Sequence, residues 1–214
     1  MKKIILKIKE KYLPEKKYRA ARIWSNEELQ KIAPLFSGNI INVSAWEDSD
    51  KRGRKYEDYF INKNSYTISN YVGQRGLQGV RDEIELDLEK DLPQELFEKY
   101  DVVFNHTTLE HIFDVQKAFS NLCHMSKDIV IIVVPFLQEM HYNQGFKDYW
   151  RFTPFAVKKL FERNNFQLSY IAANNSKNES IYVFAVGTKN YEKWKEFLAI
   201  NEKIFSELGN KIIN

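Results

Sequence analysis

From about residue 38 onward, short apolar runs rich in β-branched residues alternate with stretches of helical periodicity. Seven runs have the length and composition of strands, namely 39–44, 66–70, 83–88, 101–105, 128–134, 167–172 and 181–187. Helical spacing falls between most of them, at 54–62, 94–99, 113–125 and 154–164. Alternation of this kind implies right-handed crossovers and therefore predicts a mainly parallel sheet.

The fifth and the last two runs refine this picture. The fifth, 128–134, continues into a stretch that is apolar at consecutive positions, as expected for a central strand covered on both faces. The last two are joined by the polar stretch 174–180, which leaves no room for a crossover helix, so they should pair antiparallel. We therefore predict an α/β, Rossmann-like, doubly wound sheet of seven strands, mostly parallel with an antiparallel last strand.

The two ends of the chain lie outside this alternation of predicted strands and helices. Residues 1–36 predict a basic helical extension in two segments, broken near Pro14, with Ser25 starting the second helix. The main domain spans 37–189, and the periodicity of 191–211 predicts a closing helix within 190–214. No internal repeat or second domain is indicated.

Charge is distributed unevenly along the chain. Residues 1–22 hold nine Lys or Arg and two Glu, a charge of +7, whereas the whole chain carries +3. A basic arm can contact nucleic acid or an anionic membrane, but a solvated amphipathic helix is the favoured interpretation. The rest of the chain lacks the basic excess of a dedicated nucleic-acid binder, so a nucleic-acid partner is not favoured.

A single cysteine, Cys123, excludes an internal disulfide framework and fits a reducing compartment. No apolar stretch reaches transmembrane length. These observations predict a cytoplasmic protein, and they leave a homo-oligomer open.

In an open α/β sheet a ligand binds beyond the carboxyl ends of the strands. The informative positions are therefore the residues that directly follow each parallel run. They are polar and aromatic here, at 42–48, 70, 87, 105–111 and 135–151.

Two of these segments resemble a known family. The stretch YDVVFNHTTLEHIFDVQKAFSNL at 100–122, followed by IVIIVVPF at 129–136, is similar to the middle of small-molecule class I S-adenosylmethionine-dependent methyltransferases. The later DYWRFTP at 148–154 resembles a segment that precedes the sixth strand in many of them. The resemblance covers roughly residues 38–187. Relatives with this pairing of motifs often act in bacterial surface-glycan (capsule polysaccharide) biosynthesis.

The resemblance implies S-adenosylmethionine as cofactor and methyl transfer to a polar small molecule, most simply O-methylation of a sugar or sugar nucleotide. Two alternatives stay open. One is methylation of a nucleic-acid base or an amine, and the other is a catalytically silent, methyltransferase-like binding subunit.

The resemblance also implies a set of cofactor-binding positions, which are Asn42, Ser44, Ala45, Trp46, Asn70, Asp87, Leu88, Asn105 and His106. Two of them depart from the family pattern. Ser44 and Trp46 stand where glycines usually let the backbone approach the cofactor, and Asn70 replaces the carboxylate that usually holds the ribose hydroxyls. Asp87 matches the acidic position near the adenine amine.

Three histidines are candidate catalytic bases, because each follows a strand. His141 is the first choice, His111 better suits pocket lining or loop orientation, and His106 better suits the methionyl end of the cofactor. The predicted acceptor-binding residues are His141, Lys147, Asp148, Tyr149 and Arg151. Arg151 either holds a phosphate of the acceptor or pairs with Asp148, three residues away. His106, Glu110, His111 and His141 could in principle converge on one ion, but the first three follow no compact ligand spacing such as i, i+4, so no metal is predicted.

Overall fold

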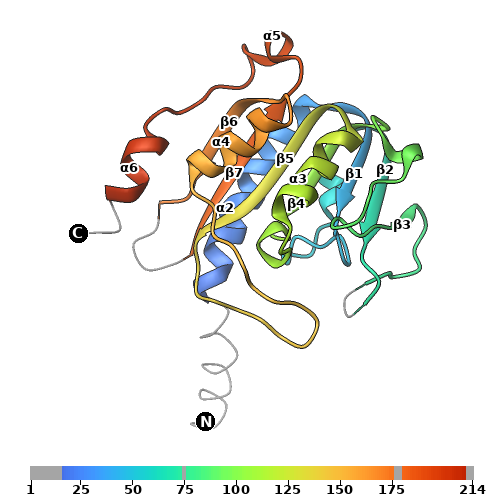
Figure 1. The fold of residues 1–214 in the computed structure, drawn as a ribbon. Coiled ribbons are helices and arrows are strands. Elements are labelled where there is room, and N and C mark those ends of the chain that lie inside the picture. Colours follow the sequence, from blue (N-terminus) through green and yellow to red (C-terminus); the bar gives the residue numbers. More distant parts are fainter. Residues whose placement is uncertain (1–15, 74–75, 176–179, 211–214) are drawn as a thin grey trace.

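The computed structural model describes residues 16–73, 76–175 and 180–210. Its centre is one sheet of seven strands in the order β3-β2-β1-β4-β5-β7-β6 (Figure 1). The strands are β1 (Ser37–Val43), β2 (Asn62–Asn70), β3 (Glu83–Glu85), β4 (Tyr100–His106), β5 (Ser126–Leu137), β6 (Gln167–Ala173) and β7 (Ile181–Thr188). The first five strands pair in parallel, and β7 pairs antiparallel with both β5 and β6. The predicted fold class and all seven predicted strands are thereby confirmed.

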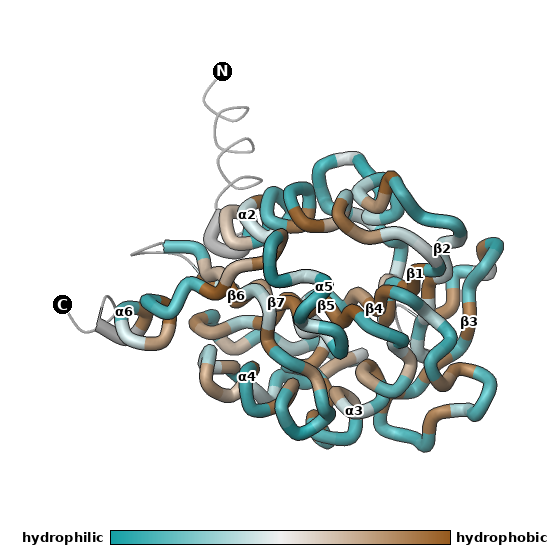
Figure 2. Tube along the Cα trace, turned by 90° about the horizontal axis from the view of Figure 1, so that it is seen from above, coloured by the Kyte–Doolittle hydropathy of each residue, from teal (hydrophilic) through white to brown (hydrophobic). Residues whose placement is uncertain are grey.

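Helices cover both faces of this sheet. In Figure 2 the strands lie in one row, with α2 (Lys16–Ile32) on one side and α3 (Val115–Met125) and α4 (Pro154–Arg163) on the other. The C-terminal segment adds α5 (Tyr191–Trp194) and α6 (Ile204–Asn210). Within the described residues, no helix combines the length and apolar character needed to cross a membrane.

The central strand β5 divides the core in two. Val130, Ile132 and Val134 belong to the cluster under α3 and α4, whereas Ile129 and Ile131 belong to the cluster under α2. Because successive side chains of a strand point to opposite faces, an uninterrupted apolar run fills both layers. The interpretation of this segment as a doubly covered central strand is therefore correct.

The prediction of a helix start at Ser25 is wrong. Helix α2 runs through this position, and the break near Pro14 lies outside the described residues. Ala21, Leu29 and Ile32 are buried along one face, so the apolar stripe continues across the polar Ser-Asn pair. The Ser25 hydroxyl donates to the carbonyl of Arg22 within the helix, which removes its tendency to act as a cap.

Two predicted helices between strands are only short 3₁₀ turns. The stretch 54–62 contains one at Tyr56–Tyr59, and 94–99 contains one at Gln94–Leu96. In the first stretch the backbone N–H of Lys55 donates to the carboxylate of Asp58, and that of Glu57 donates to the carboxylate of Asp48. Local side-chain acceptors of this kind satisfy the backbone without a helix.

The predicted closing helix over 191–211 is interrupted. Helix α5 ends at Trp194, and Ile200 forms an isolated parallel bridge with Ile171 of β6 before α6 begins at Ile204. Leu198 and Ile204 are both buried. Docking of this segment against the sheet edge therefore prevails over the helical periodicity of its sequence.

Candidate functional site

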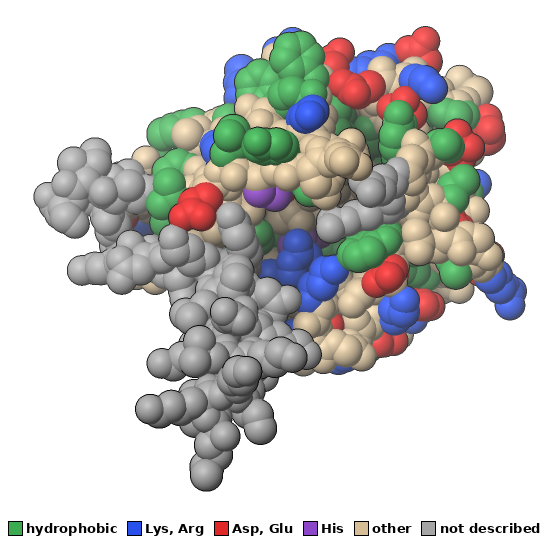
Figure 3. Space-filling model, turned by 90° about the horizontal axis from the view of Figure 1, so that it is seen from below, with side chains coloured by type: hydrophobic (Ala, Val, Ile, Leu, Met, Phe, Trp, Pro, Cys, Tyr) green, Lys and Arg blue, Asp and Glu red, His purple; other side chains and the backbone are tan. Residues whose placement is uncertain are grey.

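A cavity of about 700 Å³ opens at the carboxyl ends of the parallel strands. Its lining comes from the segments after β1, β2, β3 and β4, from the loop 138–147 after β5, and from α2. In the view from below, a histidine and several Lys or Arg side chains gather in a hollow of the surface (Figure 3). This is the edge where the sequence places a ligand.

The first loop, which follows β1, contains no glycine, yet several of its residues have the positive φ angles that glycine usually adopts. Ser44, Trp46 and Asp48 have φ angles of 59°, 50° and 53°. This left-handed region costs a non-glycine residue of the order of 1 kcal/mol. The two positions where the family has glycines therefore keep the backbone conformation that glycines favour, while carrying side chains.

Asn70 holds this loop in place. Its Oδ1 accepts from the N–H of Trp46 at 2.6 Å, and its Nδ2 donates to the carbonyl of Trp46 and to Glu83. Asn42 acts similarly, donating to the buried carboxylate of Asp48, which also accepts from the hydroxyl of Tyr66. Both amides were predicted to bind cofactor. In the structure they line the cavity, and their side chains also fix the loop backbone.

His106, at the end of β4, is engaged at both ring nitrogens. Nδ1 accepts from Arg22 and lies 3.0 Å from the hydroxyl of Thr107, which leaves Nε2–H to donate to Ser25 at 2.9 Å. Burial, and then the neighbouring Arg22, hold the pKa of His106 well below its usual range. The ring is therefore neutral, and it ties α2 to the sheet.

Arg22 is a half-buried cation that no sequence motif marks. Its guanidinium donates to the Tyr56 hydroxyl, to His106 and to Thr107, all of which are neutral groups. Arg22 also lines the cavity. A half-buried guanidinium whose hydrogen bonds go to neutral groups can hold an anionic group of a ligand.

On the opposite side of the cavity, the two motifs of the resemblance pack against each other. The carbonyl of Glu110 accepts from the N–H groups of Tyr149 and Trp150, and the indole of Trp150 donates to the carbonyl of Ile112. His111 completes the contact, because its Nδ1–H donates to the carbonyl of Lys147 at 2.6 Å. These bonds dock the loop after β5 onto the 3₁₀ turn Leu109–His111, which we call the LEH turn.

Asp148 and Arg151 form a bidentate ion pair at 2.6 and 2.7 Å. Arg151 also donates to the carbonyls of Gln138, Glu139 and Trp150. Although burial opposes it, hydrogen bonding from Arg151 lowers the pKa of Asp148. Of the two interpretations left open for Arg151, the structure shows the pairing with Asp148.

Asp148 also reaches His141. It accepts from the backbone N–H of His141 at 2.8 Å and lies 3.3 Å from the Nδ1 of its ring. The rings of His141 and His111 are packed edge to face, with their centroids 4.9 Å apart. The loop therefore brings two histidines together that are thirty positions apart in the sequence.

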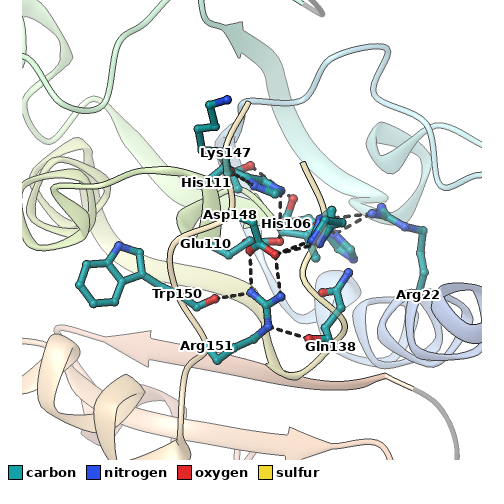
Figure 4. Close-up of polar contacts among 12 residues, drawn as sticks. Arg22, His106, Glu110, His111, Gln138, Lys147, Asp148, Trp150 and Arg151 are labelled. Carbon is teal, nitrogen blue, oxygen red and sulfur yellow. Dashed lines mark hydrogen bonds and ion pairs between the residues drawn. The ribbon is translucent and has the colours of Figure 1, made fainter. Parts of the chain in front are cut away.

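Glu110 lies beside these histidines and is almost completely buried. Its Oε1 is 3.7 Å from the Nε2 of His111, and its Oε2 has no hydrogen-bond partner. Burial raises the pKa of Glu110 to about 8 and lowers that of His111. In Figure 4 Glu110 and His111 lie beside Asp148, with Gln138 nearby and Arg22 on the other side.

Most of the predicted site residues line the cavity. These are Asn42, Ser44, Ala45, Trp46, Asn70, Asp87, Leu88, His106, His111, His141, Lys147 and Tyr149. Three are not in its lining, namely Asn105, Asp148 and Arg151. Asn105 is buried and donates to the carbonyl of Val43 across the β1–β4 pair. The sequence analysis did not propose Arg22, Tyr56, Gln138 or Tyr182, since no local motif marks them.

Similarity to known proteins was found among solved structures and not at the level of sequence. No protein-family profile and no curated protein matches the sequence. Among solved structures, magnesium protoporphyrin IX methyltransferase (ChlM) of Synechocystis PCC 6803 with bound SAM has a TM-score of 0.55 at 10% identity, covering 84% of this chain and 85% of that chain. The 1,6-didemethyltoxoflavin-N1-methyltransferase of Burkholderia thailandensis has a TM-score of 0.52 at 12% identity, with 82% and 84% covered.

A third similar structure is the N-terminal domain of EvdMO1, crystallised in the presence of SAH and D-fucose. Its TM-score is 0.52 at 12% identity, and 78% of this chain and 82% of that chain are covered. The fold of this chain is therefore that of class I S-adenosylmethionine-dependent methyltransferases. At these identities, similarity shows the fold, and function has to be argued from the site.

Proposed function

We propose that this protein transfers the methyl group of S-adenosylmethionine to a polar small molecule. The observation that carries this proposal is the half-buried cation Arg22, whose side-chain hydrogen bonds go to neutral groups, in the lining of a cavity at the carboxyl ends of β1 and β4. The solved structures with bound SAM or SAH that share this fold support the choice of cofactor.

The cofactor end of the cavity comprises the first loop, Arg22 and the segment after β3. Arg22 would hold the methionyl carboxylate of the cofactor through a charge-assisted hydrogen bond. The left-handed backbone at Ser44 and Trp46 lets the loop pass close to the cofactor. Asp87 and Leu88, which line the far part of the cavity, suit the adenine.

The cofactor supplies an activated methyl group on a sulfonium. What remains for this chain's residues is to align the acceptor with that methyl group and to exclude water, and alignment alone contributes roughly 7–11 kcal/mol in favourable models. His106 has no free lone pair for the proton of an acceptor, because its Nδ1 accepts from Arg22 and its Nε2–H is donated to Ser25. Acceptor activation therefore falls to the cluster of Glu110, His111 and His141.

His141 is the proposed base for a hydroxyl acceptor. Its Nδ1 lies next to Asp148, which orients the ring and stabilises it when it takes a proton at the other nitrogen. A sugar or sugar nucleotide is the favoured acceptor, with Lys147 and Tyr149 at the mouth of the cavity as binding groups. EvdMO1, crystallised with D-fucose present, shows this fold in a protein studied with a sugar.

The test is calorimetric titration of the protein with S-adenosylhomocysteine and, in parallel, S-adenosylmethionine. We expect saturable 1:1 binding in the native chain and a loss of at least 10-fold in affinity in Arg22→Ala. Arg163→Ala is the matched control, because Arg163 is exposed at the end of α4. Binding that is equal in all three proteins would overturn the role of Arg22.

Two other functions differ in their outcome. A silent, methyltransferase-like binding subunit, suggested by the glycine-free first loop, would show no heat and no thermal stabilisation at millimolar cofactor. An enzyme for nucleic-acid bases or amines would bind cofactor and would also bind RNA with an affinity that falls steeply with salt.

A further inference from the structure

Three side chains on the acceptor side of the cavity together resemble a metal-ligand set. Glu110, His111 and His141 each offer one ligand atom, and these atoms lie within 4.8 Å of one another. Two imidazoles and one carboxylate are a donor set that binds zinc and other first-row divalent ions. The sequence predicts no metal because Glu110 and His111 follow no compact ligand spacing and His141 lies thirty positions away; the loop after β5 brings His141 to them.

Both imidazoles have an oxygen partner on the nitrogen away from the cluster. The Nδ1–H of His111 donates to the carbonyl of Lys147, and the Nδ1 of His141 lies 3.3 Å from Asp148. Oxygen partners of this kind set the tautomer of metal-binding histidines and leave Nε2 as the ligand atom. For His111, Nε2 is the atom that lies 3.7 Å from Glu110.

Two buried oxygens at this place are without hydrogen-bond partners. One is the Oε2 of Glu110, whose side chain is 1% exposed, and the other is the Oε1 of Gln138. Both residues line the cavity. An orphaned buried carboxylate oxygen costs free energy that a cation would recover. This observation is independent of the spacing of the three ligand atoms.

We propose that Glu110, His111 and His141 bind one divalent first-row transition cation of the zinc type. Three protein ligands leave further coordination positions open towards the cavity, as in catalytic rather than structural sites. Asp148, held by Arg151, orients His141 from behind. Hard ions such as Mg²⁺ prefer oxygen ligands and are not expected here.

The role of the cation in catalysis rests on the proposed function, but its binding does not. If the chain is a methyltransferase, the open positions would hold an oxygen of the acceptor and lower the pKa of its hydroxyl. This would replace proton uptake by His141 as the means of activation.

The experiment uses the full chain without a polyhistidine tag, freed of metal by chelator and dialysis. Titration with Co²⁺ followed by visible absorption, and with Zn²⁺ by calorimetry, should show one site per chain. Mg²⁺ should give no saturable heat. Glu110→Gln and His141→Ala should each weaken Zn²⁺ binding at least 10-fold and abolish the Co²⁺ bands.

His124→Ala is the matched control, since this histidine is exposed and stacks on Phe97 away from the cavity. It should bind Zn²⁺ like the native chain. Thermal unfolding of the metal-free variants verifies that they fold. Absence of a site in the native chain, or equal binding in all variants, would overturn the proposal. Binding of S-adenosylhomocysteine to the same metal-free sample separates this outcome from failure of the proposed function.

Discussion

The two halves of the cavity are built in different ways. The cofactor half is formed by strand ends, and its loop is held by side chains that project from the sheet, with Asn70 and Asn42 bound to the first loop. The acceptor half is formed by a loop without regular structure between β5 and α4, held by the Asp148–Arg151 pair and by bonds to the LEH turn. Under the proposed function, the sheet would provide a fixed frame for the cofactor, while the loop would carry the groups that select and activate an acceptor.

If this division is correct, removing a group from the acceptor half should leave cofactor binding intact. The largest effect is expected for His141→Ala, whichever way His141 activates the acceptor. Turnover should fall by about 10²–10⁴-fold, the usual contribution of a positioned acid–base group. The affinity for S-adenosylhomocysteine, measured by calorimetry, should be unchanged. Turnover equal to that of the native chain would remove His141 from the site.

Breaking the Asp148–Arg151 ion pair tests whether this pair stabilises the acceptor loop independently of the cofactor half. Asp148→Ala leaves Arg151 without its carboxylate in a largely buried position, which should cost about 3 kcal/mol of local or global stability. We expect faster proteolysis within 138–150 with little change in cofactor affinity. Glu162→Ala, which breaks the exposed pair with Lys159, is the control and should change stability by less than about 1 kcal/mol. Equal proteolysis in both variants would refute this role.

A substitution in the first loop is expected to have the opposite effect, an increase in the stability of the cofactor half. Ser44→Gly removes the left-handed strain of a non-glycine residue and should stabilise the fold by about 0.5–1 kcal/mol. Ser65→Gly, in the extended strand β2, should instead destabilise it by a similar amount. Denaturant unfolding of both variants measures the difference. Destabilisation by Ser44→Gly would mean that contacts of the Ser44 hydroxyl contribute more to stability than relief of the backbone strain.

The smallest effect is a dependence on pH. The pKa of Asp148 is lower in the folded chain than in the unfolded chain, where it is about 3.9. Its stabilising contribution is therefore complete above the unfolded value and is lost as the pH falls through the folded value. Thermal unfolding between pH 6 and pH 2 should show a smaller acid-induced loss in Asp148→Asn than in the native chain. Identical pH profiles would contradict the pKa shift.

The strands were predictable because their signal is local. Runs such as 128–134 are too apolar for any surface element, and the short polar link 174–180 excludes a crossover whatever the rest of the chain does. The helices were less predictable, because tertiary contacts override their periodicity. Ser25 looks like a cap, yet it bonds to His106 from another element.

The candidate site also contains residues that were predictable from the sequence and residues that were not. Its cavity-lining residues after the strands, among them Ser44, Asp87 and His111, followed from the rule that ligands bind at the carboxyl edge. Arg22 could not be found in this way, because it lies on a helix that precedes the first strand and reaches the cavity only through packing.

By itself, the sequence determined the sheet, its antiparallel last strands and the sheet edge at which the cavity lies, since these depend on periodicity and on connection lengths. Only the tertiary structure decided which side chains meet there. It brings Arg22 to the cavity in a half-buried position, bonds Asn70 to the first loop, and places His141 beside Glu110 and His111. The physical reason is that such contacts join positions far apart in the chain, and their strength comes from burial, which no local pattern records.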